Sequence, residues 1–216
     1  MFAASCGSSA QAPSGALPVL KVRDTWTERS SVNGSEITSV GTVIGEQVFN
    51  GIDCYIFERT IPQMGALYKK TCQVDKTTMQ NIGYKESLIY TNGTVYRNKT
   101  MNASYNYSVK PYPLSVGKTW TVTVNITTTG SLSEQKQTIT ETYSYIYKVE
   151  KVESIKVPAG TFQCFKIVTY SYYSDTNLAL YTEWVTDVSG GVDVKQIDND
   201  SGITTELVSY SLSKQL

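Results

Sequence analysis

The chain has 216 residues, which is long enough to bury a substantial core and fits one large domain or two small ones. Lys and Arg together number 19, as do Asp and Glu, so the formal net charge of zero argues against a nucleic-acid or polybasic membrane surface. Histidine is absent, which excludes Ser-His and Cys-His nucleophile pairs, a His general base and His-containing zinc sites.

The amino-terminal segment is rich in small and polar residues. Ala3-Ala4-Ser5-Cys6 resembles the lipobox of exported lipoproteins, in which the cysteine is acylated, although five preceding residues are too few for a full export signal. We expect Cys6 to carry a lipid anchor and residues 1–18 to form a flexible tether; the alternative is an ordinary polar tail. This anchor would be the only membrane attachment, because no apolar run approaches the ~18 to 20 residues of a membrane span.

Strand signals dominate the chain from residue 22 onward. Alternating apolar and polar residues predict strands at 22–32, 36–49, 52–60, 66–75, 84–97, 152–157, 162–173, 179–187, 192–198 and 203–213, together with a long hairpin over 120–149. Asn33-Gly34 and Asn92-Gly93 are typical hairpin turns between them. No amphipathic helix longer than two turns is evident, so we predict an antiparallel all-β fold.

The four cysteines include a pair that flanks a predicted turn. Cys54 and Cys72 lie on either side of Ile61-Pro62-Gln63-Met64-Gly65, and a hairpin centred at residue 63 would place them directly opposite each other. In an oxidising compartment we expect a disulfide between them. The competing pair is Cys54 with Cys164, which occupy equivalent positions in an apparent internal repeat.

Sequons for glycosylation are more frequent than composition predicts. Of ten asparagines, seven begin Asn-X-Ser/Thr: Asn33, Asn92, Asn98, Asn102, Asn106, Asn125 and Asn199. This excess favours an exported chain, with sugars crowded over residues 92–106 if the host glycosylates. The alternative is that strands rich in Ser, Thr and Asn contain such triplets for compositional reasons.

The hairpin over 120–149 carries the candidate ligand surface. Trp120, Val122, Val124 and Ile126 alternate with hydroxylated residues, and three tyrosines of the second strand share one face. Curling of the sheet would bring the two apolar faces together on its concave side. The candidate ligand-binding residues are Val122, Val124, Ile126, Tyr143, Tyr145 and Tyr147; ordinary cross-strand packing is the alternative.

Two turn sequences invite a functional interpretation, and we favour a structural one for both. Pro158 and Gly160 within Val157-Pro158-Ala159-Gly160-Thr161-Phe162 predict a rigid turn with Phe162 buried beneath it. Asp198-Asn199-Asp200 faintly resembles a calcium loop but lacks the later ligands, so a hairpin turn is expected. We therefore predict no metal and no cofactor.

The chain also repeats itself. Leu20–Thr27 matches Leu114–Thr121, Cys54-Tyr55-Ile56-Phe57 parallels Cys164-Phe165-Lys166-Ile167, and Ala66-Leu67-Tyr68 parallels Ala179-Leu180-Tyr181. We expect two similar β halves, residues 19–110 and 111–216, that form one composite domain. The alternative is that alternating β sequences match one another by chance.

The second half resembles a group of exported bacterial and archaeal β proteins. The resemblance rests on Pro113–Trp120, Val157–Ile167 and Glu183-Trp184-Val185, and covers about residues 105–200. This group is similar in architecture to LolA and LolB, the lipoprotein carriers and receptors. The resemblance implies an antiparallel sheet curled into a half-open barrel around an apolar concavity, without catalytic residues.

These observations lead to a functional hypothesis. We expect an exported, lipid-anchored, non-enzymatic binding protein of the cell envelope, whose concave face holds an apolar ligand such as an acyl chain. The alternative is a structural or adhesive surface protein with a filled interior and no small-molecule ligand. A cavity of a few hundred Å³ would separate them. A glycoside hydrolase would instead need two carboxylates within ~5 to 9.5 Å in a cleft, and the sequence does not bring candidates such as Glu141 and Glu183 together with another acid.

Overall fold

The computed structural model describes residues 12–63, 65–90, 95–132, 135–172, 178–187 and 192–213. Within these residues the chain forms twelve strands and no helix, which confirms the all-β fold class. The strands are β1 (Thr25–Val32), β2 (Ser35–Phe49), β3 (Ile52–Gln63), β4 (Ala66–Asp75), β5 (Asn81–Tyr90), β6 (Val95–Tyr107), β7 (Thr119–Leu132), β8 (Gln135–Val157), β9 (Gly160–Ser171), β10 (Ala179–Val185), β11 (Lys195–Asp198) and β12 (Thr204–Ser211). No helix in the described part of the chain is long and apolar enough to span a membrane.

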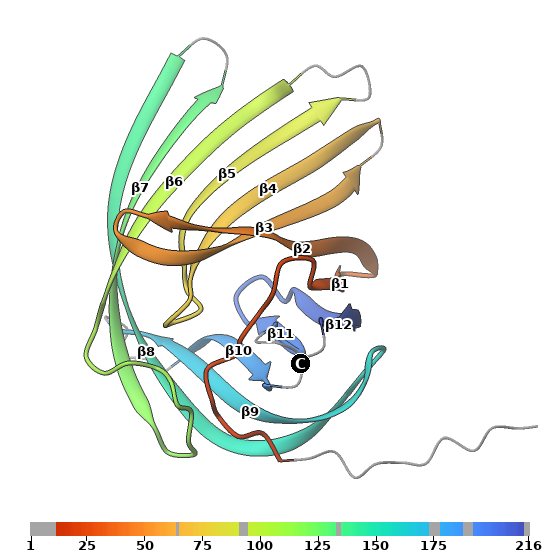
Figure 1. Cartoon of the computed structure of the whole chain (residues 1–216), viewed down its shortest axis with the longest axis vertical. Helices are drawn as coiled ribbons and strands as arrows, with labels where there is room; N and C mark the ends of the chain where they lie inside the picture. Colours follow the sequence, from red (N-terminus) through yellow and green to blue (C-terminus); the bar gives the residue numbers. More distant parts are fainter. Residues whose placement is uncertain are drawn as a thin grey trace, which may run out of the picture.

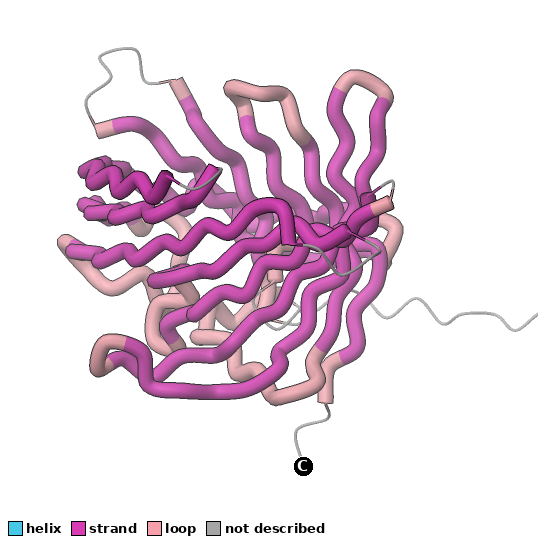
Figure 2. The backbone as a smooth tube through the Cα atoms, turned by 90° about the horizontal axis from the view of Figure 1, so that it is seen from above, coloured by secondary structure: helices cyan, strands magenta, loops and turns pink. Residues whose placement is uncertain are grey.

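The sheet closes on itself. Each strand pairs antiparallel with the next along the chain, and β1 pairs with both β2 and β12, so the strands form a closed barrel (Figures 1 and 2). Trp26 of β1 lies opposite Gly41 on one side and Tyr210 on the other. The predicted half-open barrel is therefore wrong, because the first and last strands satisfy each other's backbone groups and leave no open edge between them.

Alternation along β7 positions the inner and outer faces as the sequence predicts. Trp120, Val122 and Val124 are buried, with exposed fractions of 5%, 2% and 4%. The intervening hydroxyls lie outside, where Thr123 Oγ1 and Ser144 Oγ of β8 are 3.1 Å apart and Thr142 donates to Asn125 Oδ1 at 2.8 Å. The β7–β8 pairing confirms the long hairpin, with an apolar inner face and a hydrogen-bonded polar outer face.

Two clusters of buried side chains stabilise the barrel. One surrounds Trp26, Val43 and Leu207 and joins β1–β3 and β12 to residues of β8, β9 and β10. The other contains Trp120, Val149 and further residues of β7, β9 and β10. The repeat-related tryptophans Trp26 and Trp120 thus lie in separate clusters, each buried, as expected for core positions.

The turn between β8 and β9 contacts β12. Gly160 has a φ of 140°, and Ala159 N donates to Leu207 O of β12 at 3.1 Å. Phe162 is buried and its ring centroid lies 5.9 Å from that of Tyr210. The structural interpretation of this motif is confirmed: Pro158 and Gly160 form the turn, and Phe162 anchors it.

The expected disulfide is not present. Cys54, Cys72 and Cys164 are all free thiols. Gln63 pairs with Ala66, which moves the hairpin centre beyond residue 63 and places Cys54 opposite Asp75 and Cys72 opposite Phe57. Phe57 lies directly opposite Cys72, so these two side chains share one face of the β3–β4 pair. Cys54 is three positions from Phe57, an odd number, so its side chain lies on the other face from Cys72. The alternative partner, Cys164, is free as well.

The residues matched in the internal repeat fall on corresponding strands. Trp26 and Trp120 are each the second residue of their strand, in β1 and β7. Cys54 and Cys164 lie in β3 and β9, and Ala66 and Ala179 begin β4 and β10. Each expected half thus contributes six of the described strands, while a duplication of the chain stays a prediction.

The described part of the expected tether lies against the barrel. Ser14 N donates to Asp187 Oδ2 at 3.1 Å, and Leu114 N donates to Gly15 O at 2.7 Å. Leu20 is 2% exposed, and its N donates to the hydroxyl of Tyr55 at 3.1 Å. Residues 14–20 therefore cover one side of the fold, and Cys6 lies outside the described residues.

Most of the sequons occupy exposed positions. Asn33 lies in the β1–β2 turn and Asn199 in the β11–β12 turn. Three further sequons have exposed asparagine side chains on strands, Asn102 and Asn106 on β6 and Asn125 on β7. Asn98 is in β6, in a stretch whose side chains are not described, and Asn92 lies outside the described residues. Glycosylation of these positions stays a prediction.

Candidate functional site

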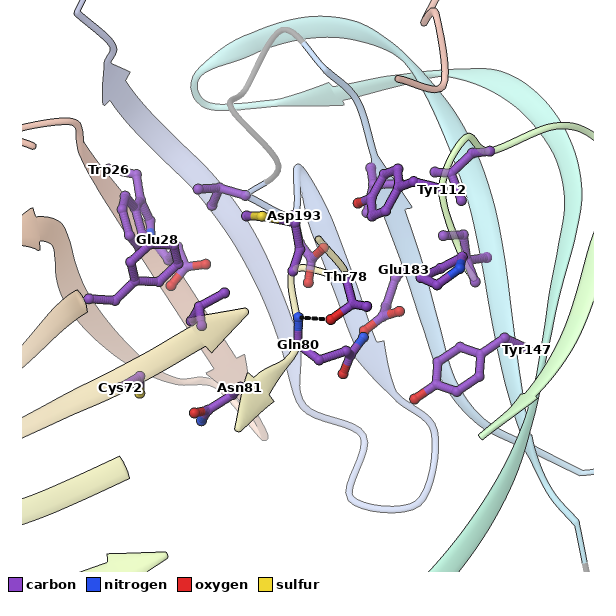
Figure 3. A pocket seen from close by; sticks show the side chains of 18 of the residues that line it. Trp26, Glu28, Cys72, Thr78, Gln80, Asn81, Tyr112, Tyr147, Glu183 and Asp193 are labelled. Atoms are coloured by element: carbon purple, nitrogen blue, oxygen red, sulfur yellow. Dashed lines mark hydrogen bonds between the residues drawn. The ribbon is translucent and has the colours of Figure 1, made fainter. Parts of the chain in front are cut away.

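The barrel interior is not filled by its own side chains. A cavity of about 400 Å³, which we call the main cavity, lies among residues of β1, β3, β4, β7, β8, β9 and β10 (Figure 3). A second cavity of about 250 Å³, the side cavity, is lined by β6 to β11. Gln80, Tyr147 and Glu183 line both, so the two cavities adjoin. Together they offer space on the scale of a small-molecule site.

The side cavity contains most of the predicted ligand residues. Val124, Ile126, Tyr145 and Tyr147 line it. Val122 packs in the core cluster instead, and Tyr143 is 37% exposed, with its ring stacked on Tyr145 at a centroid distance of 6.2 Å. The structure thus brings four of the six candidates together around one space, and a ligand-binding role for them stays a prediction.

Tyrosines give this apolar wall a polar component. The Tyr147 ring stacks on Trp120, with centroids 5.2 Å apart and planes at 3°. Burial raises the pKa of Tyr147 far above its usual range, and burial raises the pKa of Tyr105 to about 12. Tyr105 donates its hydroxyl to Asn81 O at 2.7 Å. These phenols remain protonated at physiological pH, so the wall presents aromatic faces and neutral hydroxyl groups.

The turn between β4 and β5 lies at the boundary of the two cavities. Asp75 braces it by accepting hydrogen bonds from Thr77 N at 2.7 Å and from Thr78 Oγ1 at 2.9 Å. Met79 has a φ of 58°, a left-handed conformation that is uncommon for a residue other than glycine. The turn thereby positions Thr78, Met79 and Gln80 on the main cavity, with Gln80 also on the side cavity.

One wall of the main cavity carries cations. Arg59 of β3 lies directly opposite Lys70 of β4, and both line the cavity. The Arg59 guanidinium contacts Glu28 at 2.7 Å and donates from Nε to Ser39 Oγ at 3.0 Å. The Lys70 ammonium lies 4.1 Å from the centroid of the Tyr84 ring. Neither residue was predicted from the sequence, where the available signal was a charged residue on the inward-facing parity of a strand.

Another wall carries two carboxyl groups, Glu183 of β10 and Asp193 of the segment before β11 (Figure 3). Burial raises the pKa of Glu183, although Gln196 Nε2 donates to its Oε1 at 3.1 Å and acts in the opposite direction. Burial also raises the pKa of Asp193, and the neighbouring acids Glu183 and Glu28 raise it further. Both side chains keep some surface toward the cavity while protein surrounds them on all other sides.

The two carboxyl groups share one environment. Both line the main cavity, and burial raises the pKa of both. Glu141, the other carboxylate considered in the sequence, is exposed on β8 and lines neither cavity. Burial disfavours the charged form of Glu183 and Asp193, and the uncharged form of a carboxyl group can donate a hydrogen bond.

Within the ranges that the structure describes, no three Cys, Asp or Glu side chains are placed so that they could hold a metal ion together. The Asp198–Asp200 segment is the turn that the sequence predicts: Asp198 Oδ1 accepts from Asp200 N at 3.0 Å and from Ser201 N at 3.1 Å. Its carboxylate therefore braces its own loop.

Comparison with known proteins gives a family match and two structural similarities. A family model described as DUF3108-like matches residues 66–211, which span β4 to β12. No curated protein matches the chain. The chain is similar to a candidate lipoprotein from Parabacteroides distasonis, at 13% identity and a TM-score of 0.35, over 93% of this chain and 100% of that chain. It is also similar to a candidate exported protein with a YmcC-like fold from Bacteroides fragilis, at 11% identity and a TM-score of 0.36, over 90% of this chain and 98% of that one. The resemblance to the LolA and LolB carriers stays a prediction.

Proposed function

The chain belongs to the DUF3108-like family, and we propose that it is an exported binding protein that holds an apolar or amphipathic small molecule inside its barrel. The observation that carries this proposal is the unfilled interior, with the main and side cavities adjoining at Gln80, Tyr147 and Glu183. Protein interiors are normally packed to crystal-like density, so open space of this size inside a barrel favours an occupant.

The lining of the side cavity indicates the chemistry of that occupant. Val124, Ile126 and Tyr145 offer an apolar and aromatic surface. Burying an apolar chain against such a surface gains about 25 cal/mol for each Å² removed from water. The main cavity adds charged groups on two walls, which suits a ligand with a polar end as well as an apolar part.

The alternative functions have weaker support. A structural or adhesive protein without a ligand would fill its barrel with its own side chains, and an interior with two cavities argues against it. A hydrolase would need one carboxyl group as acid and another as base or nucleophile around a bound substrate, and no observation assigns these two roles to Glu183 and Asp193. The proposal is therefore a binding protein that catalyses no reaction.

Export and anchoring form part of the proposal. The Ala3-Ala4-Ser5-Cys6 segment supports acylation of Cys6, and the exposed sequons of β6 and β7 suit a surface outside the cytoplasm. Residues 14–20 lie along the barrel, so an anchor at Cys6 would keep the fold close to the membrane surface. The cell envelope is the proposed location.

Uptake of a dansyl-labelled undecanoic acid by the purified protein tests the proposed function. We expect dansyl emission to rise on binding, and Ile126→Trp, which fills the side cavity, to weaken binding at least about tenfold. The matched control is Thr127→Trp on the outer face of the same strand, where Thr127 Oγ1 lies 3.3 Å from Thr140 Oγ1; it should bind as the wild type does. Absence of uptake by the wild type, or equal uptake by Ile126→Trp, would contradict the proposal.

A further inference from the structure

We infer that the main cavity binds the anionic head group of a single-chain amphiphile through Lys70, assisted by Arg59. This inference rests on the proposed function and names the ligand class for the same site. The apolar chain of the ligand would then extend into the side cavity, which adjoins the main cavity at Gln80 and Tyr147.

Lys70 lies directly opposite Arg59 on the wall of the main cavity. The two residues face each other across β3 and β4, next to the opposed pair of Phe57 and Cys72, and all four line the main cavity. Like charges directly opposite each other destabilise a sheet, and a barrel wall gains nothing from them in packing. Such a local conflict is expected where function, and not stability, selects the residues.

Arg59 and Lys70 differ in the contacts that they make within the described residues. Arg59 uses two N–H groups, one on Glu28 at 2.7 Å and one on Ser39 Oγ at 3.0 Å, out of the five that a guanidinium has. Lys70 forms no ion pair among the described residues, and its ammonium lies over the Tyr84 ring at 4.1 Å. The remaining N–H groups of Arg59 and the ammonium of Lys70 can therefore donate to an anion brought by a ligand.

Charged residues on β5 and β6 continue the row of inward-facing residues that begins with Arg59 and Lys70. Glu86 of β5 lies opposite Lys70, and Lys99 of β6 lies opposite Glu86. Glu86 accepts the hydroxyl of Tyr68 at 2.7 Å, and the Lys99 ammonium lies 5.7 Å from the Tyr84 ring centroid. Arg59, Lys70 and Lys99 outnumber Glu86 along this row, and the two of them that line the cavity are Arg59 and Lys70, so an anionic group is attracted to the β3–β4 wall.

The acid pair on the other wall does not oppose this assignment. Burial raises the pKa of Glu183 and of Asp193, which disfavours the charged form of both carboxyl groups. Glu28, the third acid that lines the cavity, is paired with the Arg59 guanidinium at 2.7 Å. The anion therefore belongs beside Lys70, away from the carboxyl groups.

Two matched probes test the inference: the dansyl-labelled undecanoic acid and its methyl ester, which lacks the charge. We expect the wild type to bind the acid about tenfold more tightly than the ester. Lys70→Met should abolish this preference by weakening the acid alone, while Lys70→Arg, which keeps a cation at the same position, should retain it. The outer-face control Lys69→Met, which removes the ion pair with Glu58 at 2.6 Å, should bind both probes as the wild type does.

The outcomes separate this inference from the proposed function. Equal wild-type affinity for acid and ester, or an equal loss of both in Lys70→Met, overturns the head-group site and leaves internal ligand binding intact. Failure of both probes to bind overturns both proposals. Displacement of the acid probe by decanoate or by decyl phosphate supports the anionic site and identifies a carboxylate or a phosphate head group; displacement by neither overturns it.

Discussion

Asp193 and Glu183 show, at the scale of single residues, how the barrel changes the chemistry of a side chain. Their pKa values are raised mainly by burial, so the folded protein holds protons that the unfolded chain releases at about pH 4. Stability is therefore fully present below about pH 4 and falls as the pH rises toward the folded-state values. The charged form is disfavoured because protein, not bulk water, surrounds both groups.

Replacing Asp193 with Asn should remove part of this penalty. We expect Asp193→Asn to raise the free energy of unfolding by about 1 to 3 kcal/mol at about pH 7 and to change it little at about pH 4. Urea unfolding at the two pH values measures this. Asp198→Asn is the opposite control, since hydrogen bonds from Ser201 and Asp200 lower the pKa of Asp198, so its loss should reduce stability at neutral pH. A destabilised Asp193→Asn at about pH 7 would contradict the assignment.

Packing between strands decides which residues the inner face tolerates, and β1 and β2 provide an example at the scale of elements. Gly41 lies directly opposite Trp26, and a Cβ at Gly41 would overlap the indole ring. The missing side chain is what allows the tryptophan to lie flat against β2, with its ring 5.1 Å from the centroid of Phe57. Trp26 in turn lines the main cavity.

Gly41→Ala should therefore destabilise the barrel by about 1 to 3 kcal/mol, the usual cost of overpacking a core. Gly45→Ala on the same strand is the matched control, because no heavy atom lies within 4 Å of its Cβ position. Chemical denaturation followed by tryptophan fluorescence compares the two variants. Equal stability of Gly41→Ala and Gly45→Ala would show that Trp26 moves freely, and would contradict the packing described for β1 and β2.

At the scale of the whole molecule, the proposed lipid anchor predicts the state of the mature protein. Mass spectrometry of protein purified from its own host should find Cys6 as the first residue of the mature chain, with acyl groups attached. Cys6→Ser should stay unacylated and leave the membrane fraction. Any sugars on the exposed sequons would add separate mass. A wild-type mass without acyl groups would contradict anchoring while leaving the barrel and its cavities unaffected.

The sequence by itself determined most of the strands and the two faces of the long hairpin, although it predicted one strand over 84–97 where the structure has β5 and β6 and missed most of β6. The alternation along residues 120–126 predicted which side chains of β7 point inward, and the Val157–Phe162 turn was predicted with its buried anchor. Both follow from local rules: side chains alternate across a strand, and Pro and Gly restrict the backbone where they stand. Four of the predicted ligand residues line the side cavity for the same reason.

Only the tertiary structure decided closure, register and the charged walls. Closure needs β1 to meet β12 across the length of the chain, and a shift of the β3–β4 hairpin centre was enough to separate Cys54 from Cys72. Lys70, Arg59, Glu183 and Asp193 come together around one cavity from strands and a loop far apart in sequence. No local pattern specifies such neighbours, because they depend on pairing between distant strands and on which strand completes the barrel.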